Sequence, residues 1–178
     1  MNPLRWTFRV SWLLGFVVCA ALLAYALFAE YQLGLAPCPL CIFQRIAFIW
    51  MGLWFLIGGL HAPRGNGRWF YRVLIVLGAI TGIVIAARHL WLQSLPPELV
   101  PSCGPGLDYL RKAFPLSKVL TLVFTGSGDC AQVNWRFLGL AMPFWTLAWY
   151  VLLGIWALLP HRRHVKPMRN VGPPHALT

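Results

Sequence analysis

Four long stretches of the chain carry no charged side chain, and they limit its possible folds more than any other feature. They cover residues 10–29, 46–63, 73–87 and 137–160. A helix of about twenty apolar residues crosses a hydrocarbon core of about 30 Å. Hydrophobic residues make up 59% of the chain and charged residues only 11%, whereas soluble domains are about 25% charged. The sequence therefore predicts an integral membrane protein.

We expect an all-α membrane protein, in which four antiparallel transmembrane helices form one domain over residues 1–160. The spans are expected near residues 10–29, 43–62, 70–89 and 138–160. The third uncharged stretch is short, but aromatic side chains flank it, and Arg72 and Arg88 can extend toward the two membrane surfaces. The basic residues 161–178 are expected to form a disordered cytoplasmic tail.

The distribution of Lys and Arg predicts the orientation of these helices. With the N-terminus inside, the cytoplasmic pieces hold nine Lys and Arg and no acidic residue. The outer pieces hold six, together with all four Asp and Glu. Because positive charge favours the cytoplasmic side, both termini are expected there. An alternative is a signal peptide cleaved near Ala24-Tyr25-Ala26, which would leave three spans.

The net charge of +11 could also indicate a nucleic-acid partner. Nucleic-acid-binding proteins gather their basic residues on a polar face or arm. Here most of them interrupt apolar stretches, and no nucleic-acid-binding motif is present. We therefore expect no nucleic-acid partner.

Two outer loops are expected, near residues 30–42 and 90–136. Between them they contain four of the five cysteines: Cys38, Cys41, Cys103 and Cys130. An oxidising compartment would favour two disulfides in these loops. If both were only structural, a Cys103–Cys130 bond would contribute roughly 3.5 kcal/mol to stability. Cys19 lies in the first span, where a buried thiol is usually inert.

A short apolar stripe in the second outer loop has helical spacing. Leu116, Val119, Leu120 and Val123 recur at intervals of three and four residues. This pattern favours a short amphipathic helix lying in the outer interface, or a packed segment of loop.

The Cys38-Pro39-Leu40-Cys41 motif is a poor structural staple, because such a small ring constrains the unfolded chain little. The C-x-x-C spacing is typical of redox pairs. The prolines before an apolar stretch place it at a helix start, where the helix dipole favours a thiolate. Arg45 follows Cys41 by one helical turn and could stabilise an anion there, or could be a plain membrane anchor.

A metal site is the alternative use of a C-x-x-C motif. A structural zinc site needs two further ligands nearby, and His61 with the tail histidines lies on the predicted cytoplasmic side. His89 follows the third span at the outer surface, at the depth expected for Cys41 and Arg45. A lone histidine there is usually an interfacial side chain, so we expect no metal.

Together these features resemble the DsbB family of bacterial inner-membrane proteins, which reoxidise the periplasmic thiol oxidase DsbA. The resemblance covers the length, the four spans, and the two outer loops with a cysteine pair in each. Its most specific motifs are Pro37–Arg45 (PCPLCIFQR), Gly126–Ala131 (GSGDCA) and Trp135–Pro143 (WRFLGLAMP).

The resemblance implies an oxidoreductase with disulfides Cys38–Cys41 and Cys103–Cys130. Cys103 would form a mixed disulfide with DsbA, and Cys130 would then pair transiently with Cys38. Cys41 would pass the electrons to a bound quinone, either ubiquinone or menaquinone.

The resemblance also implies which residues hold this quinone. Arg45 would polarise a quinone oxygen, and His89 would lie near the ring beside Cys41. It further implies that the short helix of the second outer loop lies flat on the membrane.

Three alternatives stay open at this point. The chain could be a non-enzymatic protein with four spans and disulfide-stapled loops. It could be a DsbB-like oxidase dedicated to one DsbA paralogue. A vitamin-K-epoxide-reductase-type enzyme would use similar chemistry, but its loop pattern fits less well.

Overall fold

A computed structural model of the chain describes residues 8–35, 37–63, 67–96, 128–131 and 136–159. Its long helices are α1 (Phe8–Leu33), α2 (Pro39–His61), α3 (Gly67–Gln93) and α7 (Met142–Leu158). The short elements are α6 (Gly128–Ala131), β1 (Arg136–Phe137) and β2 (Leu140–Ala141). Cys103, the apolar stripe of the second outer loop and the basic tail lie outside the described residues.

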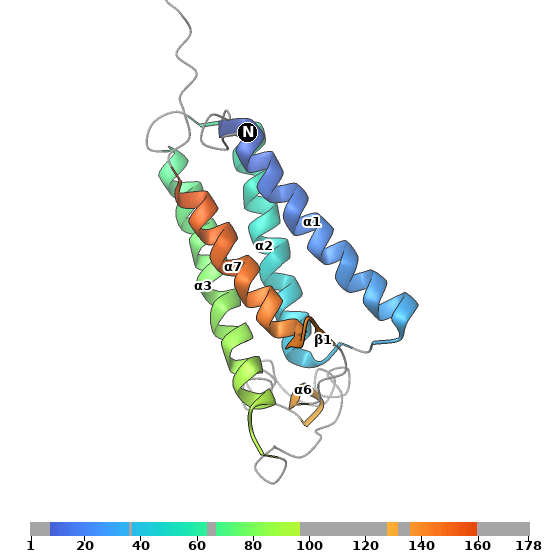
Figure 1. Cartoon of the computed structure of the whole chain (residues 1–178). Helices are drawn as coiled ribbons and strands as arrows, with labels where there is room; N and C mark the ends of the chain where they lie inside the picture. Colours follow the sequence, from blue (N-terminus) through green and yellow to red (C-terminus); the bar gives the residue numbers. More distant parts are fainter. Residues whose placement is uncertain (1–7, 36, 64–66, 97–127, 132–135, 160–178) are drawn as a thin grey trace, which may run out of the picture.

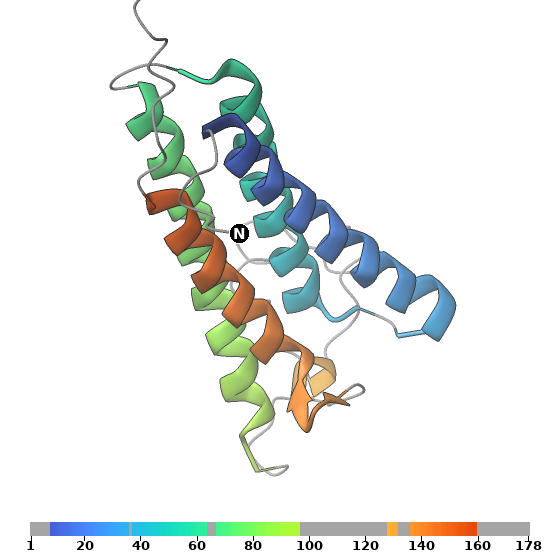
Figure 2. The same cartoon turned by 45° about the horizontal axis from the view of Figure 1, so that its top comes forward.

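The four long helices form an antiparallel bundle (Figure 1). α2 packs against both α1 and α3, and α3 packs against α7. At the lower end of Figure 1, α1 diverges from the other helices, and α6 lies beside α3. The view in Figure 2 shows the same arrangement, with the start of α2, the end of α3 and the start of α7 at one end of the bundle. The sequence-based prediction of an all-α membrane fold is confirmed.

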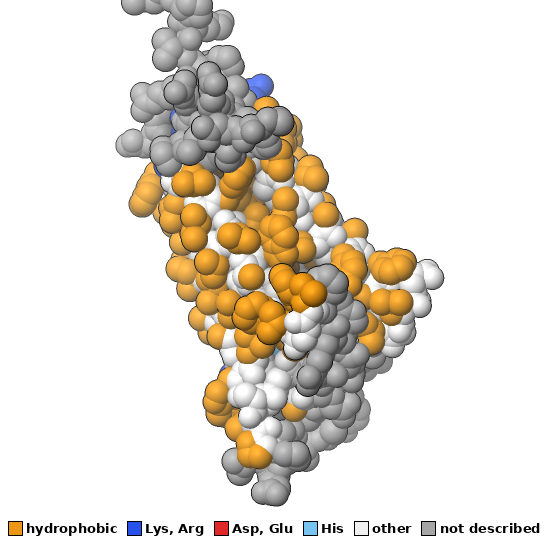
Figure 3. All heavy atoms as spheres, in the orientation of Figure 1, with side chains coloured by type: hydrophobic (Ala, Val, Ile, Leu, Met, Phe, Trp, Pro, Cys, Tyr) orange, Lys and Arg blue, Asp and Glu red, His pale blue; other side chains and the backbone are white. Residues whose placement is uncertain are grey.

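The outer surface of the bundle is apolar, as a lipid-facing surface must be. Hydrophobic side chains cover the face of the helices seen in Figure 3, and many large ones are exposed, among them Val17, Ile49, Trp69 and Leu152. Three helices are long and apolar enough to cross a membrane: α1, α2 and α3. α7 has 17 residues, which at 1.5 Å per residue is near the lower limit for a span. The chain is a multi-pass membrane protein.

A small hairpin comes before α7 and shortens it. The fourth uncharged stretch starts at Phe137, but the helix starts only at Met142. β1 and β2 pair antiparallel around Leu138 and Gly139, which both have positive φ, at 52° and 79°. Two successive residues with positive φ are typical of a type I′ hairpin turn. This hairpin was not expected from the sequence.

Aromatic side chains packed against glycines hold the helices together. A Cβ atom on Gly58 of α2 would overlap the ring of Trp12 in α1, and one on Gly82 of α3 would overlap the ring of Tyr150 in α7. Trp12 and Tyr150 are fully buried. These two contacts fix how closely neighbouring helices approach each other.

We expect Gly82→Val to destabilise the bundle by about 1–3 kcal/mol, because the new side chain displaces Tyr150 from its packing site. Ala87→Val places the same side chain at an exposed position of the same helix and is the control. Thermal unfolding in detergent measures both variants. Equal unfolding temperatures for the two variants would contradict the tight α3–α7 contact.

Candidate active site

The C-x-x-C motif forms the first turn of α2. Cys38 is the N-cap, with extended backbone, and Pro39 is the first helical residue. The Cys38 Sγ accepts a hydrogen bond from the backbone N–H of Cys41 at 3.3 Å. The two sulfur atoms lie 2.9 Å apart as free thiols in contact. A helix start supplies N–H groups and positive dipole that favour a thiolate, so this position suits a redox pair.

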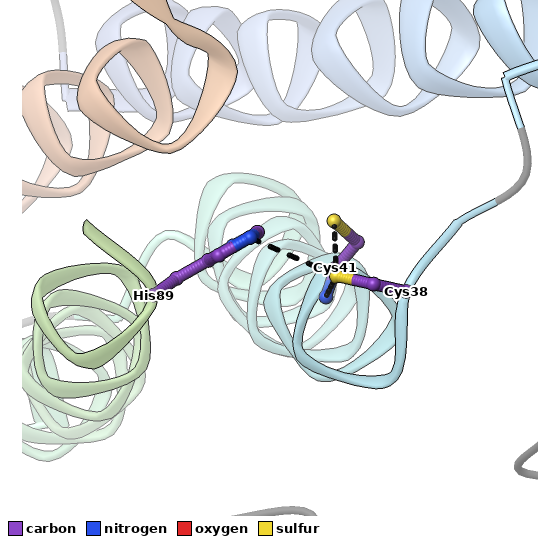
Figure 4. Close-up of side chains that lie close together, drawn as sticks. All are labelled: Cys38, Cys41 and His89. Carbon is purple, nitrogen blue, oxygen red and sulfur yellow. Dashed lines mark hydrogen bonds between the residues drawn. The ribbon is translucent and has the colours of Figure 1, made fainter. Parts of the chain in front are cut away.

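His89 reaches this pair from α3, near the end of that helix (Figure 4). Its Nε2 lies 3.8 Å from the Cys38 Sγ, and its side chain is buried. The sequence predicted His89 at the depth of Cys41, and the resemblance implied a place for it near the quinone ring beside Cys41. The structure places it in contact with the motif, because the antiparallel packing of α2 and α3 brings the start of one helix beside the end of the other.

Cys130, in α6, adds a third sulfur atom to the site. Its side chain is 1% exposed and packs in one cluster with Cys38. The Cys130 thiol hydrogen-bonds with the Cys38 thiol, and its backbone hydrogen-bonds with the ring of His89. The second outer loop therefore returns to the C-x-x-C motif, and a cysteine from each loop meets at Cys38.

The protonation of Cys38 follows from these contacts. Hydrogen bonds to the Cys130 and Cys41 sulfurs, together with burial, raise the pKa of the Cys38 thiol above its usual range. The Cys38 thiol therefore keeps its proton more readily than a free cysteine does, and its S–H donates to the Cys41 sulfur.

Gln44 supports the site from one helical turn deeper in α2. It is buried, and its side-chain amide lies 3.4 Å from the His89 Nδ1. Thr146 of α7 donates to the Gln44 Oε1 at 3.0 Å, and the Tyr150 hydroxyl donates to the Gln44 backbone carbonyl at 2.6 Å. Gln44 thus links α2, α3 and α7 just below the thiols. Sequence reasoning missed it, although a lone amide in an apolar stretch was a usable signal.

Arg45 lies on the α1 side of α2. Its guanidinium forms an ion pair with Glu30 at the end of α1 and donates to the backbone carbonyl of Ala26 at 3.1 Å. The Arg45 and Glu30 side chains are 21% and 25% exposed. Sequence reasoning considered a membrane anchor or an anion-stabilising cation and did not foresee Glu30 as its partner. The ion pair joins α1 to α2 at the end where α1 diverges.

Three side chains of the site are of the types that bind transition metals. The ligating atoms of Cys38, Cys41 and His89 all lie within 4.8 Å of one another. α3 thus places a histidine nitrogen beside the two thiols of the C-x-x-C motif. Cys19 takes no part: it packs in the core between α1 and α2, 3.2 Å from where a Cβ on Gly52 would lie.

The sequence of the chain was compared with known protein families. The sequence matches the family described as "Disulfide bond formation protein DsbB" over residues 8–160. The chain belongs to the DsbB family. Membership makes it a disulfide-forming membrane protein with an oxidoreductase role, as the resemblance in the motifs implied.

Curated relatives that carry the name "Disulfide bond formation protein B" extend over most of the chain. One from Xanthomonas campestris pv. campestris is 51% identical over 170 residues, covering 95% of this chain and 99% of the relative. One from Chromohalobacter salexigens is 51% identical over 146 residues, covering 82% and 85%. One from Xylella fastidiosa is 47% identical over 160 residues, covering 89% and 92%. The similarity thus spans the helices and both cysteine-bearing loops.

Proposed function

We propose that the chain is a thiol:quinone oxidoreductase of the bacterial inner membrane, which reoxidises a periplasmic DsbA-type thiol oxidase. The meeting of three sulfurs at Cys38 is the observation that carries this proposal. Cys41 lies 2.9 Å from Cys38, and the Cys130 thiol contacts it from the second outer loop. A purely structural staple needs two sulfurs, whereas a third sulfur in contact allows disulfide exchange.

The Lys and Arg distribution supports one orientation. The start of α2 and the end of α3 share the bundle end that carries the thiols (Figure 1). Arg68 and Arg72 lie in the first two turns of α3, at the opposite end. Because positive charge favours the cytoplasmic side, the thiols face the periplasm and both termini are cytoplasmic.

The proposed reaction starts with the disulfides Cys103–Cys130 and Cys38–Cys41. A thiolate of DsbA attacks Cys103, and the second DsbA thiol resolves the mixed disulfide, leaving DsbA oxidised and Cys103 and Cys130 reduced. Cys130 then attacks Cys38, which releases the Cys41 thiolate. Cys103 resolves the Cys130–Cys38 bond, so the second-loop disulfide forms again and the C-x-x-C pair holds the two electrons.

The residues near Cys41 suit a membrane quinone, either ubiquinone or menaquinone. When bound, the quinone accepts two electrons and two protons. Its two oxygens need hydrogen-bond donors, and the Arg45 guanidinium carries five N–H groups, more than its contacts with Glu30 and Ala26 use. Cys41 is half-buried, and Arg45 one turn away remains partly exposed. Arg45 would hold and polarise a quinone oxygen, and His89 would lie near the ring beside the Cys41 sulfur.

The energetics require such an acceptor. DsbA is strongly oxidising, with a reduction potential of about −120 mV, whereas the reduction potentials of structural disulfides lie below about −300 mV. A structural disulfide is less oxidising than DsbA by far more than about 30 mV, and for this two-electron couple each such step corresponds to about 1.4 kcal/mol. A stapled loop therefore could not oxidise DsbA. Respiration keeps the quinone pool oxidised, so it can draw the electrons onward.

The test is quinone reduction by the purified full-length chain supplied with reduced DsbA. We expect one soluble quinone to be reduced for each DsbA disulfide formed, measured by quinone absorbance and by thiol titration. Cys41→Ser should abolish this reaction, because the thiol that delivers the electrons is missing. Oxidation of DsbA without quinone reduction would overturn the quinone proposal. A failure to oxidise DsbA would overturn the proposal that DsbA is the partner.

A further inference from the structure

Three side chains that ligate transition metals surround one small volume at the start of α2. The ligating atoms of Cys38, Cys41 and His89 lie within 4.8 Å of one another (Figure 4). Structural zinc sites are built from cysteine and histidine, and a C-x-x-C pair commonly supplies two of the four ligands. The chain therefore brings together the ligand types and the spacing that such sites use.

The distances are close to those of a bound ion. With Zn–S bonds of about 2.3 Å, tetrahedral geometry places two sulfur ligands about 3.7 Å apart. The Cys38 Sγ lies 3.8 Å from the His89 Nε2 and 2.9 Å from the Cys41 Sγ. Of these two distances, the second has to widen, by less than about 1 Å. Cys41 is half-buried and not fully enclosed, so a rotation of its side chain can supply this change.

A fourth ligand and a charge balance are also within reach. The Cys130 thiol interacts with the Cys38 thiol, but its sulfur is outside the set of ligating atoms that lie within 4.8 Å of one another, so a shift of Cys130 has to bring it in as the fourth ligand. Three thiolates, from Cys38, Cys41 and Cys130, more than balance the charge of a divalent cation and form a Cys₃His set with His89, which lowers the cost of holding the ion in a buried site. Cys38, Cys130 and His89 are nearly inaccessible to solvent, so water competes little with these ligands.

The surroundings of His89 fit a metal ligand as well. A histidine that binds a metal through one ring nitrogen usually donates its other ring N–H to a neighbouring acceptor. The Gln44 side-chain amide lies 3.4 Å from the His89 Nδ1, and a half-turn of this amide presents its oxygen there. Thr146 has one hydroxyl proton and contacts both the Pro143 carbonyl and the Gln44 Oε1. After the half-turn it can donate to Pro143 and accept from Gln44.

We propose that the reduced chain binds one thiophilic divalent cation of the zinc type through Cys38, Cys41 and His89, with Cys130 as the fourth ligand. Binding breaks the S–H bonds of the ligating cysteines, releases their protons to water and forms metal–sulfur bonds, with no change in oxidation state. A Cys38–Cys41 disulfide has no thiolate to offer, so metal binding and oxidation exclude each other. The bound ion therefore acts as a reversible inhibitor that holds the motif reduced.

The test uses the full-length chain, purified without a polyhistidine tag and reduced under anaerobic conditions. We titrate it with Co²⁺ and follow the sulfur-to-metal charge-transfer absorbance, then displace the Co²⁺ with Zn²⁺ against a chromophoric chelator. One ion per chain is expected, with the charge-transfer band, and the oxidised chain should show neither. Zn²⁺ should also protect the C-x-x-C cysteines from alkylation, as measured by mass spectrometry.

Variants locate the site. Cys41→Ser is expected to weaken binding at least about 100-fold and to lower the charge-transfer band, because one of the three sulfur ligands is lost. His89→Gln should weaken binding about 10- to 100-fold and keep the band, because the sulfur ligands remain. The controls are Cys19→Ala in the core and His61→Gln, whose ring contacts Tyr71 at the far end of α2. Both controls should bind as the unaltered chain does.

Two results would overturn the proposal: no saturable binding by the reduced chain, or binding that Cys41→Ser leaves unchanged. The inhibitory consequence rests on the proposed function, but the binding does not. Metal binding without any thiol oxidation of DsbA would refute the proposed function and uphold the site. Turnover that is insensitive to Zn²⁺, in a chain that binds no Co²⁺, would refute the metal site and uphold the proposed function.

Discussion

Replacing Cys130 with serine is expected to lower steady-state reoxidation of DsbA by about 1,000-fold or more, because a nucleophile that forms a covalent intermediate is removed. Among the described residues, Cys130 is the cysteine of the second outer loop that lies beside Cys38. Serine has a similar size but cannot form a disulfide. Electrons that enter at Cys103 would then have no path to the C-x-x-C pair. The measurement is quinone reduction against time with reduced DsbA in excess.

The same variant should trap a partner. Without Cys130, a Cys103 thiolate that attacks oxidised DsbA forms a mixed disulfide, releases one DsbA thiol and lacks its own resolving cysteine. Non-reducing gels should show this adduct with Cys130→Ser. Cys19→Ala is the matched control, since Cys19 packs in the core away from the other thiols, and its turnover should stay within about twofold. Normal turnover in Cys130→Ser would contradict the exchange path.

The sequence was sufficient for the fold, because the membrane imposes a simple rule. A helix that crosses lipid must be long, apolar and uncharged, and such stretches are visible without any tertiary information. The hairpin before α7 was not predictable in this way. Leu138 adopts positive φ there although it is not glycine, so the local sequence gave no turn signal.

The site was predictable only in its local part. The spacing of Cys38 and Cys41 and the preceding prolines determine the helix start, and the structure has that geometry. The contacts of Gln44 and Arg45 depend on which helices become neighbours. Gln44 is 102 residues from Thr146 in sequence, and Arg45 is 15 residues from Glu30. No local pattern encodes such pairs, so tertiary packing had to reveal them.

Arg45→Ala is expected to lower quinone reduction about 10- to 100-fold, the usual effect of losing a hydrogen bond to a charged group worth about 1.5–3 kcal/mol. Electrons arriving on a quinone place negative charge on its oxygens, so a cationic donor matters most as the reaction proceeds. Arg45→Lys should weaken apparent quinone affinity, because an ammonium lacks the planar fork of donors of a guanidinium. The measurement is steady-state rate against quinone concentration.

The ion pair with Glu30 provides the control that separates this role from plain anchoring. Glu30→Ala removes the ion pair but keeps the guanidinium beside Cys41 and its hydrogen bond to the Ala26 carbonyl. If Arg45 only anchors α1, both variants should lose little activity, because partly exposed ion pairs contribute about 0–1 kcal/mol. If Arg45 holds a quinone oxygen, Glu30→Ala should stay within about threefold of the unaltered chain while Arg45→Ala falls much further. Thiol exchange between DsbA and the second outer loop, measured in a single turnover without quinone, should survive in both variants. Equal quinone dependence in Arg45→Ala and the unaltered chain would leave Arg45 as a structural link between α1 and α2.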